Sequence, residues 1–150
     1  ALLHGGEQEG GIRAGTLAVH NIVGFGKAAE IAMRDMKKNH SLICKLDDYL
    51  ITKLRNCDNI RIFIPDEFRC KGIISILVDR TDFNNERFIK RISDNVAIST
   101  GSACSLGEPS HVIKALGLTD KTSKILRISL NKFTTKEDID LFISVLSRNI

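Results

Sequence analysis

The chain has 150 residues, of which 43% are hydrophobic and 27% charged, and its formal net charge is +4. This composition is typical of a globular chain with one ordinary core and excludes a disordered one. No apolar run approaches the roughly 20 residues that a membrane-spanning helix needs. Because charges of both signs are interspersed and the chain has one tyrosine and no tryptophan, the composition argues against a nucleic-acid-binding module.

The chain begins with a glycine-rich segment that has no secretory signal pattern. Residues 1–16 contain five of the eleven glycines, which predicts a loop. A loop with no element before it indicates a piece of a longer protein. The cysteines Cys44, Cys57, Cys70 and Cys104 form no C-x-x-C pair. The pattern therefore predicts no metal site, and reduced thiols in a cytoplasm.

Periodicity predicts an alternation of helices and short strands. Apolar residues at helical spacing predict helices over residues 17–36, 42–54, 84–93, 110–116 and 139–146, with a break at residues 39–41. Short β-branched runs predict strands over residues 60–64, 73–78, 96–98 and 125–130. A capping box of Thr134 and Glu137 is predicted before the last helix. This order indicates an α/β or α+β domain in which a sheet of few strands is covered by helices.

Cys104 is the first candidate for chemistry. It stands in a run of small residues, 99–107, between a predicted strand and a predicted helix. One interpretation is an exposed nucleophile, whose thiolate is favoured by the helix start and by Lys114 and Arg127 if the fold brings them close. The other is a structural cysteine in a turn. The remaining three cysteines lie in or beside helical and strand segments and are predicted to be structural.

Two further segments have a functional and a structural interpretation. The segment from Gly10 to Thr16 leads into the first helix, where free N–H groups, Arg13 and the Thr16 hydroxyl suit a phosphate. The alternative is that Thr16 is an ordinary N-cap. Arg127 interrupts an apolar strand. It either grips a substrate carboxylate with its planar guanidinium or faces outward from the sheet.

Several motifs, taken in chain order, resemble those of the cysteine desulfurases of the class-V aminotransferase type. His4-Gly5-Gly6-Glu7-Gln8-Glu9 and Arg13-Ala14-Gly15-Thr16-Leu17 resemble the family's HGGGQE and RSGT-L stretches. Ser99 to Cys104 resembles its SSGSAC loop, and Glu108-Pro109-Ser110 its EPS helix start. Residues 113–118, 126–129 and 133–135 are similar to RALGL, IRFSL and RFTT. The resemblance spans nearly the whole chain.

The resemblance implies the C-terminal domain of the fold-type-I transferase fold. Residues 1–16 would be a strip of the cofactor-binding large domain, and residues 17–150 the small domain with its linking helix. The implied enzyme binds pyridoxal phosphate, is normally a homodimer, and converts L-cysteine to L-alanine with a persulfide on Cys104. Arg127 matches the arginine that holds the substrate carboxylate. Thr16 matches the threonine that reaches the cofactor phosphate across the dimer.

The chain departs from the family pattern in three ways. It contains no S-x-H-K segment, which carries the cofactor lysine, so we expect this chain alone to be inactive. Gly10 stands where the family usually has arginine. Three residues separate Cys104 from Glu108, two fewer than in members that supply iron–sulfur assembly. At about 3.5 Å per extended residue, this removes about 7 Å of reach.

The sequence also allows functions other than that of part of a desulfurase. One is a non-catalytic sulfur-carrying or dimer-contributing module that works beside a separate chain bearing pyridoxal phosphate. Another is a small basic nucleic-acid binder, which the composition disfavours. The sulfur acceptor, whether a protein or a small thiol, is open. Iron–sulfur scaffolds, tRNA thiolation and DNA phosphorothioation all draw on the family.

Overall fold

The structure, a computed structural model, describes residues 1–100 and 110–150 of the chain. By its internal contacts the chain divides into two units, Ala1–Lys38 and Asn39–Ile150. The division falls within the long helix α1 (Val19–Arg55). The predicted boundary after residue 16 concerns the domains of a longer protein and stays a prediction.

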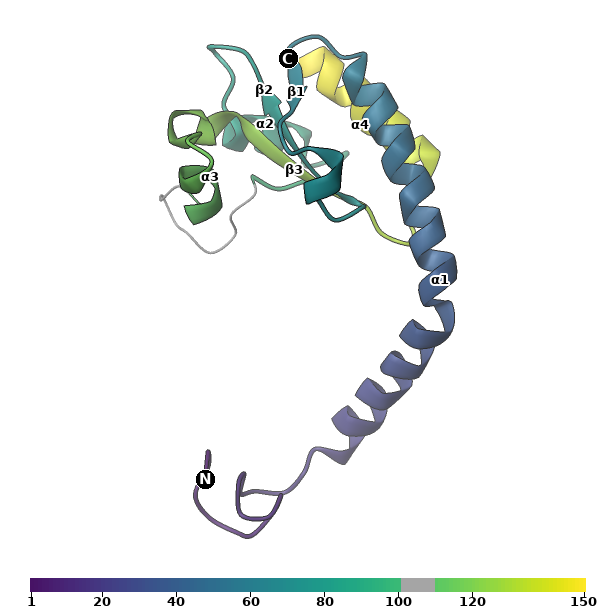
Figure 1. Ribbon diagram of the computed structural model, residues 1–150, viewed down its shortest axis with the longest axis vertical. Coiled ribbons are helices and arrows are strands. Elements are labelled where there is room, and N and C mark those ends of the chain that lie inside the picture. Colours follow the sequence, from purple (N-terminus) through teal and green to yellow (C-terminus); the bar gives the residue numbers. More distant parts are fainter. Residues whose placement is uncertain (101–109) are drawn as a thin grey trace. The chain divides into compact units, whose positions relative to one another are not determined.

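The second unit is built on a three-stranded antiparallel sheet in the order β1-β2-β3 (Figure 1). The strands are β1 (Ile60–Ile62), β2 (Ile73–Val78) and β3 (Ile125–Ser129). Isoleucine, leucine and valine make up all of the central strand β2 except Ser75, and such residues fit the pleated, buried surface of a sheet. Ser75 lies opposite Arg127 in the β2–β3 register.

Helices cover both faces of this sheet. They are α1, η1 (Asp66–Phe68), α2 (Asn85–Ile92), α3 (His111–Ala115), η2 (Thr119–Lys124) and α4 (Lys136–Asn149), where η marks a 3₁₀ helix. Local signals explain their ends. The Asn84 side chain accepts a hydrogen bond from the Arg87 N–H and caps α2. Gly117, with a φ of 68°, follows the end of α3, because glycine adopts this left-handed conformation without a Cβ clash.

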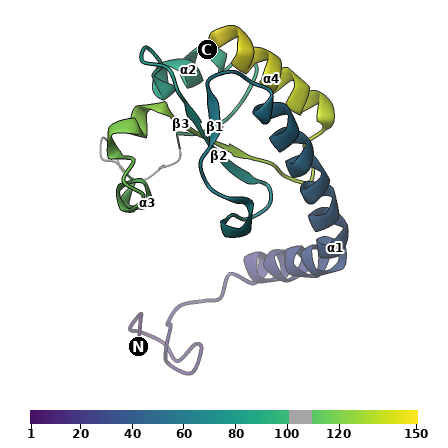
Figure 2. The same ribbon diagram turned by 45° about the horizontal axis from the view of Figure 1, so that its top comes forward.

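The main core lies on one face of the sheet. Alternate residues of β2 and β3 are buried there: Ile74, Ile76, Val78, Leu126 and Ile128. They pack with residues of α1, α2 and α4, namely Leu46, Leu50, Leu54, Phe88, Ile92, Ile139, Phe142 and Leu146. The last part of α1 lies beside α4 in both views (Figures 1 and 2). Strand alternation places Ser75 and Arg127 on the opposite face, where α3 lies.

The predicted helix break at residues 39–41 is wrong, since α1 runs through them without interruption. Asn39, His40 and Ser41 are weaker helix formers than alanine, but each costs only about 0.5 kcal/mol in a helix. None of them removes a backbone N–H, as proline would. Burial of Leu46 and Leu50 further along the helix favours a single continuous element.

The strand predicted over residues 96–98 does not form. Instead, Ser99 makes an isolated bridge with Arg127, in which each residue donates its backbone N–H to the other's carbonyl. The segment is too short for a ladder, but it still extends the sheet by one residue beyond β3. This bridge matters for the site, because it holds the backbone of Arg127 from the side opposite β2.

The first unit contains the glycine-rich segment and the beginning of α1. An isolated bridge joins Leu3 to Arg13, and the turn between them includes Gly10 and Gly11 with φ values of 62° and 77°. Large apolar side chains of this part of α1 are exposed: Val19, Ile22, Val23, Phe25, Met33 and Met36. Within residues 1–100 and 110–150, no helix has an apolar stretch sufficient to cross a bilayer.

Candidate functional site

Arg127 is the middle residue of β3, and its backbone is held on both sides. Ser75 of β2 is its partner in the sheet. On the other side, the N–H of Arg127 donates to the Ser99 carbonyl at 2.7 Å, and the N–H of Ser99 donates to the Arg127 carbonyl at 3.2 Å. The backbone of Arg127 is therefore held by a neighbouring segment on each side and does not lie at a free edge.

A pocket of about 210 Å³ lies on the face of the sheet away from the main core, and Arg127 lines it. Its apolar walls are formed by Phe63, Ile64, Val112, Ile113, Leu116 and Ile125. Its other polar lining residues are Ser75, Thr100, Ser110 and Thr122. A planar guanidinium among apolar walls and hydroxyls suits a small ligand with a carboxylate, because the fork of N–H donors matches the two carboxylate oxygens. Arg127 thus lines a pocket and does not face outward from the sheet, and its role as a carboxylate ligand stays a prediction.

Cys104 lies outside the described residues. Its neighbours in the sequence are informative, however, because Thr100 and Ser110 flank the segment 101–109 and both line the Arg127 pocket. The role of Cys104 itself stays a prediction.

Thr16 lies in the first unit, in a turn stabilised from within. The Arg13 Nη1 donates to the carbonyls of Gly15 and Thr16 at 3.0 and 3.3 Å, and the Gly15 N–H donates to Gln8 Oε1 at 3.0 Å. These contacts use the Gly15 N–H and the Arg13 Nη1, two of the donors that had suggested an anion site. The exposed Thr16 is left as the phosphate-binding candidate of this turn.

The alternative role of Thr16, as the N-cap of the first helix, is wrong. α1 begins at Val19, and the carbonyl of Ala18 accepts the N–H of Ile22 at 3.1 Å. Ala18 therefore occupies the N-cap position, two residues after Thr16. The local sequence obscured this, because threonine is a preferred N-cap residue and alanine is not.

The cysteines within the described part of the chain are free thiols. Cys57 is half-buried and donates to the Lys53 carbonyl at 3.4 Å, Cys44 is half-buried near His40, and Cys70 is exposed. In the same part of the chain, no three His, Cys, Asp or Glu side chains are grouped closely enough to hold a metal ion. None of the three thiols lines the Arg127 pocket.

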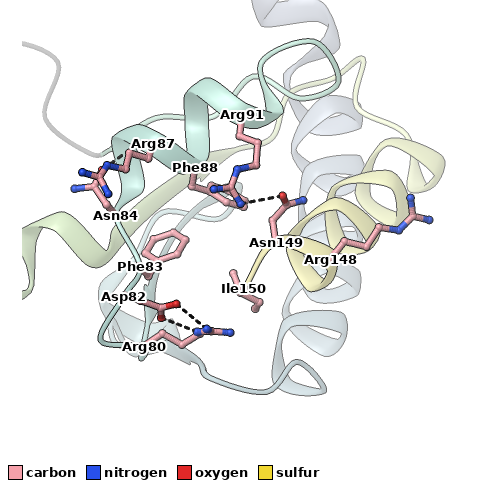
Figure 3. Close-up of a pocket in the computed structure, with 10 residues that line it drawn as sticks. All are labelled: Arg80, Asp82, Phe83, Asn84, Arg87, Phe88, Arg91, Arg148, Asn149 and Ile150. Carbon is pink, nitrogen blue, oxygen red and sulfur yellow. Dashed lines mark hydrogen bonds and ion pairs between the residues drawn. The ribbon is translucent and has the colours of Figure 1, made fainter.

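A larger and more basic pocket, of about 360 Å³, lies where α2 meets the end of α4 (Figure 3). Its arginines are Arg80, Arg87, Arg91 and Arg148. Arg80 is already paired with Asp82 at 2.8 Å. Figure 3 shows Arg148 pointing away from the paired rings of Phe83 and Phe88. Since the guanidinium groups do not converge on one point, the smaller Arg127 pocket is the better candidate site.

Among the described residues, Asp47 of α1 is a fully buried charge. It accepts hydrogen bonds from both Nη atoms of Arg69 at 2.6 Å and from the Gly72 N–H at 2.8 Å. Lys71 lies 3.3 Å away and also pairs with Asp48 and Asp66. Hydrogen bonds to Asp66, and then to Asp48, raise the pKa of Lys71. This cluster ties the segment after η1 to α1 and is structural.

The sequence interpretation missed two features that the structure makes important, and each had a weak signal. Asp47 lies beside Leu46 and Leu50 on the apolar side of the helix. A polar residue on a buried side needs a hydrogen-bonding partner. Ser75 is the single polar residue of the apolar run 73–78 and marks the face that Arg127 shares. Neither signal names the partner, which lies far away in the chain.

Comparison with known proteins agrees with this geometry. The cysteine desulfurase IscS of Shewanella loihica is 37% identical over 153 residues, which cover 100% of this chain and 37% of that protein. The cysteine desulfurase IscS of Shewanella denitrificans is 38% identical over 151 residues, which cover 99% of this chain and 37% of that protein. The chain thus spans about 37% of the length of these curated relatives.

Among solved structures, a NifS-like protein from Rickettsia africae superposes with a TM-score of 0.82 at 26% identity, covering 98% of this chain and 39% of that one. The cystine C-S lyase C-DES, at 14% identity and a TM-score of 0.64, shares the fold. The predicted fold is confirmed. Residues 4–142 match the aminotransferase class-V family. The chain therefore belongs to the class-V aminotransferase family, as its motifs indicated.

Proposed function

We propose that this chain is part of a pyridoxal-phosphate-dependent cysteine desulfurase in which Arg127 binds the carboxylate of L-cysteine and Cys104 accepts its sulfur. The observation that carries the proposal is the Arg127 pocket, whose lining includes the two residues that flank the Cys104 segment, Thr100 and Ser110. The relatives named cysteine desulfurase support the same substrate. At about 210 Å³, the pocket suits an amino acid rather than a larger ligand.

Arg127 would orient the substrate. A bidentate pair between its guanidinium and the substrate carboxylate fixes two points of a small molecule and so limits its rotation. The apolar residues Val112, Ile113 and Leu116 line the same pocket and would reduce access of water. In such surroundings the ion pair is stronger than it would be in water.

Thr16 is the residue of this chain that would contact the cofactor. Its side chain is exposed, and its hydroxyl can donate a hydrogen bond to a phosphate oxygen. Pyridoxal phosphate supplies, when bound, the electron sink that weakens the bond between Cβ and sulfur of the substrate. The cofactor lysine would come from a part of the longer protein that this chain does not contain.

Cys104 would act as the nucleophile. Its thiolate attacks the substrate sulfur, a sulfur–sulfur bond forms and the Cβ–S bond breaks, with its electron pair left on the carbon side. Protonation of Cβ completes L-alanine, and Cys104 holds a persulfide. The intact protein would be a homodimer. A Cys104 segment two residues shorter than in relatives that feed iron–sulfur scaffolds favours small thiols or acceptors that dock close to the pocket.

Substitution of Arg127 in the intact protein tests this proposal. Arg127→Gln should raise the KM for L-cysteine about 30-fold or more, because truncating one partner of a hydrogen-bonded charge pair commonly costs 2 kcal/mol or more. Arg127→Lys should recover part of the loss. Arg61→Gln, at an exposed position of β1, is the matched control and should leave KM unchanged. An unchanged KM for Arg127→Gln would contradict the assignment.

A further inference from the structure

We infer that Asn85 is a positioning residue for the Arg127 pocket, an inference that rests on the proposed function. Asn85 is the first residue of α2 and is only 4% exposed. Its side-chain Nδ2 donates to two backbone carbonyls, that of Thr122 at 3.0 Å and that of Ile125 at 2.8 Å. Thr122 and Ile125 both line the pocket that contains Arg127.

The two carbonyls belong to the junction between η2 and β3. Ile125 is the C-cap of η2 and the first residue of β3, two positions before Arg127. A 3₁₀ helix of six residues is longer than most and has poor hydrogen-bond geometry, so its end benefits from support by another element. The Thr122 carbonyl accepts the Ile125 N–H within the junction, and the Asn85 amide adds a second donor to it and supplies a donor to the Ile125 carbonyl. The amide thereby fixes the point at which the chain enters β3.

The two hydrogen bonds of the Asn85 side chain form a tether between α2 and the η2–β3 junction. The α2 end of this tether is rigid. α2 is anchored in the main core by Phe88 and Ile92, which are 3% and 1% exposed. This packing opposes a movement of α2 toward η2 when the side chain at position 85 changes. Position 85 faces two acceptors and so needs two donors on a short side chain, which a neutral asparagine amide provides. An aspartate at this place would present only acceptors, and alanine would leave the buried Ile125 carbonyl and the part-buried Thr122 carbonyl without this donor.

Loss of the tether should act on substrate binding more than on the chemical steps. Arg127 holds the substrate carboxylate before and during the reaction. A shift of the pocket wall therefore weakens binding of the substrate and of the transition state alike. Uniform weakening raises KM and leaves kcat nearly unchanged. A merely destabilised protein would instead lose active molecules, which lowers kcat and leaves KM constant.

The test uses the intact protein with Asn85→Ala and Asn85→Asp, and Asn84→Ala as the matched control. Asn84 caps the same helix but makes no bond to η2 or β3 in the described part of the chain. We expect both Asn85 variants to raise the KM for L-cysteine about fivefold or more with kcat within about twofold of the parent. Asn84→Ala should leave KM unchanged. Equal KM changes at positions 84 and 85, or a fall in kcat alone, would overturn the inference.

A second readout separates this inference from the proposed function. Phenylglyoxal modifies accessible guanidinium groups, and peptide mapping by mass spectrometry gives the rate at Arg127, with Arg61 as an internal reference. Asn85→Ala should speed modification of Arg127 and leave Arg61 unchanged. If the parent protein does not act on cysteine but this acceleration is seen, the proposed function fails and the tether stands. If the parent is active and neither KM nor labelling responds to Asn85→Ala, the tether alone fails.

Discussion

At the scale of single residues, Asp47 shows how a buried charge is held in this domain. Its carboxylate is fully buried, and the Arg69 side chain that faces it is 4% exposed. Bringing two charges out of water is costly, so such a pair is not stabilising merely because it exists. Removing one partner is different, because the other is then left buried without compensation.

Asp47→Ala should therefore lower the free energy of unfolding by about 3–5 kcal/mol, measured by urea denaturation of the intact protein. Asp48→Ala is the control. Asp48 pairs with the same Lys71, but its side chain is 70% exposed, and its loss should cost less than about 1 kcal/mol. Similar losses for the two variants would show that the buried pair has no special role.

The same pair has a pH signature. Burial alone would raise the pKa of Asp47, but hydrogen bonds from Arg69 and the Gly72 N–H outweigh burial and hold it below its ordinary value of 3.8. The unfolded chain then takes up the proton first as the pH falls. The stability difference between the parent and Asp47→Ala should be constant at neutral pH and shrink below a pH of about 4. A difference that persists unchanged into strong acid would refute this linkage.

At the scale of elements, the start of α4 shows how two overlapping local signals are resolved. The sequence offers Thr134 with Glu137 and Thr135 with Asp138 as capping boxes, and the structure uses the second. Thr134 is engaged elsewhere, because its hydroxyl accepts the Asn131 N–H at 3.1 Å and closes the preceding turn. The predicted box is thus wrong by one residue, and the cause is a turn that spacing alone does not reveal.

Thr135→Ala should destabilise the protein by about 1 kcal/mol, the usual effect of removing an N-cap hydroxyl. The Thr135 hydroxyl accepts the Asp138 N–H at 3.1 Å, and its own N–H donates to Asp138 Oδ2 at 2.9 Å. Glu137→Ala removes a charge from the same turn without removing a cap bond and should cost less. Thermal unfolding of both variants measures the difference. A larger effect for Glu137→Ala would mean that the other box forms in solution.

Local signals explain most of the strands and helices but not where they meet. The β-branched run 73–78 forms a strand with the predicted limits, because its residues suit a buried strand in any context. The helix break at residues 39–41 was predicted from composition and is absent, because packing of the later turns outweighs weak propensities. The segment before Thr100 becomes a single bridge rather than a strand, a choice that depends on β3, almost thirty residues away.

At the scale of the whole molecule, the site can be predicted only in part from the amino-acid sequence. The alternation of residues along β3 does not decide whether the Arg127 side chain faces solvent or a ligand. The family resemblance favoured the role of carboxylate ligand. The pocket itself forms where β2, β3, α3, η2 and the segment after β1 come together. The Asn85 tether joins residues 37 and 40 positions apart, and nothing in the local sequence indicates it. Such contacts are set by the tertiary fold, which local periodicity does not specify.

Because this chain spans about 37% of the length of its curated relatives, the last test uses the intact, longer protein. Persulfide mapping shows whether Cys104 accepts the sulfur of L-cysteine. The intact protein is incubated with L-cysteine, unreacted thiols are blocked, and the peptides are analysed by mass spectrometry. We expect L-alanine to form and one extra sulfur atom to be found on the Cys104 peptide, with neither seen for Cys104→Ser. Persulfide on Cys44, Cys57 or Cys70 instead, or undiminished alanine formation by Cys104→Ser, would contradict the account.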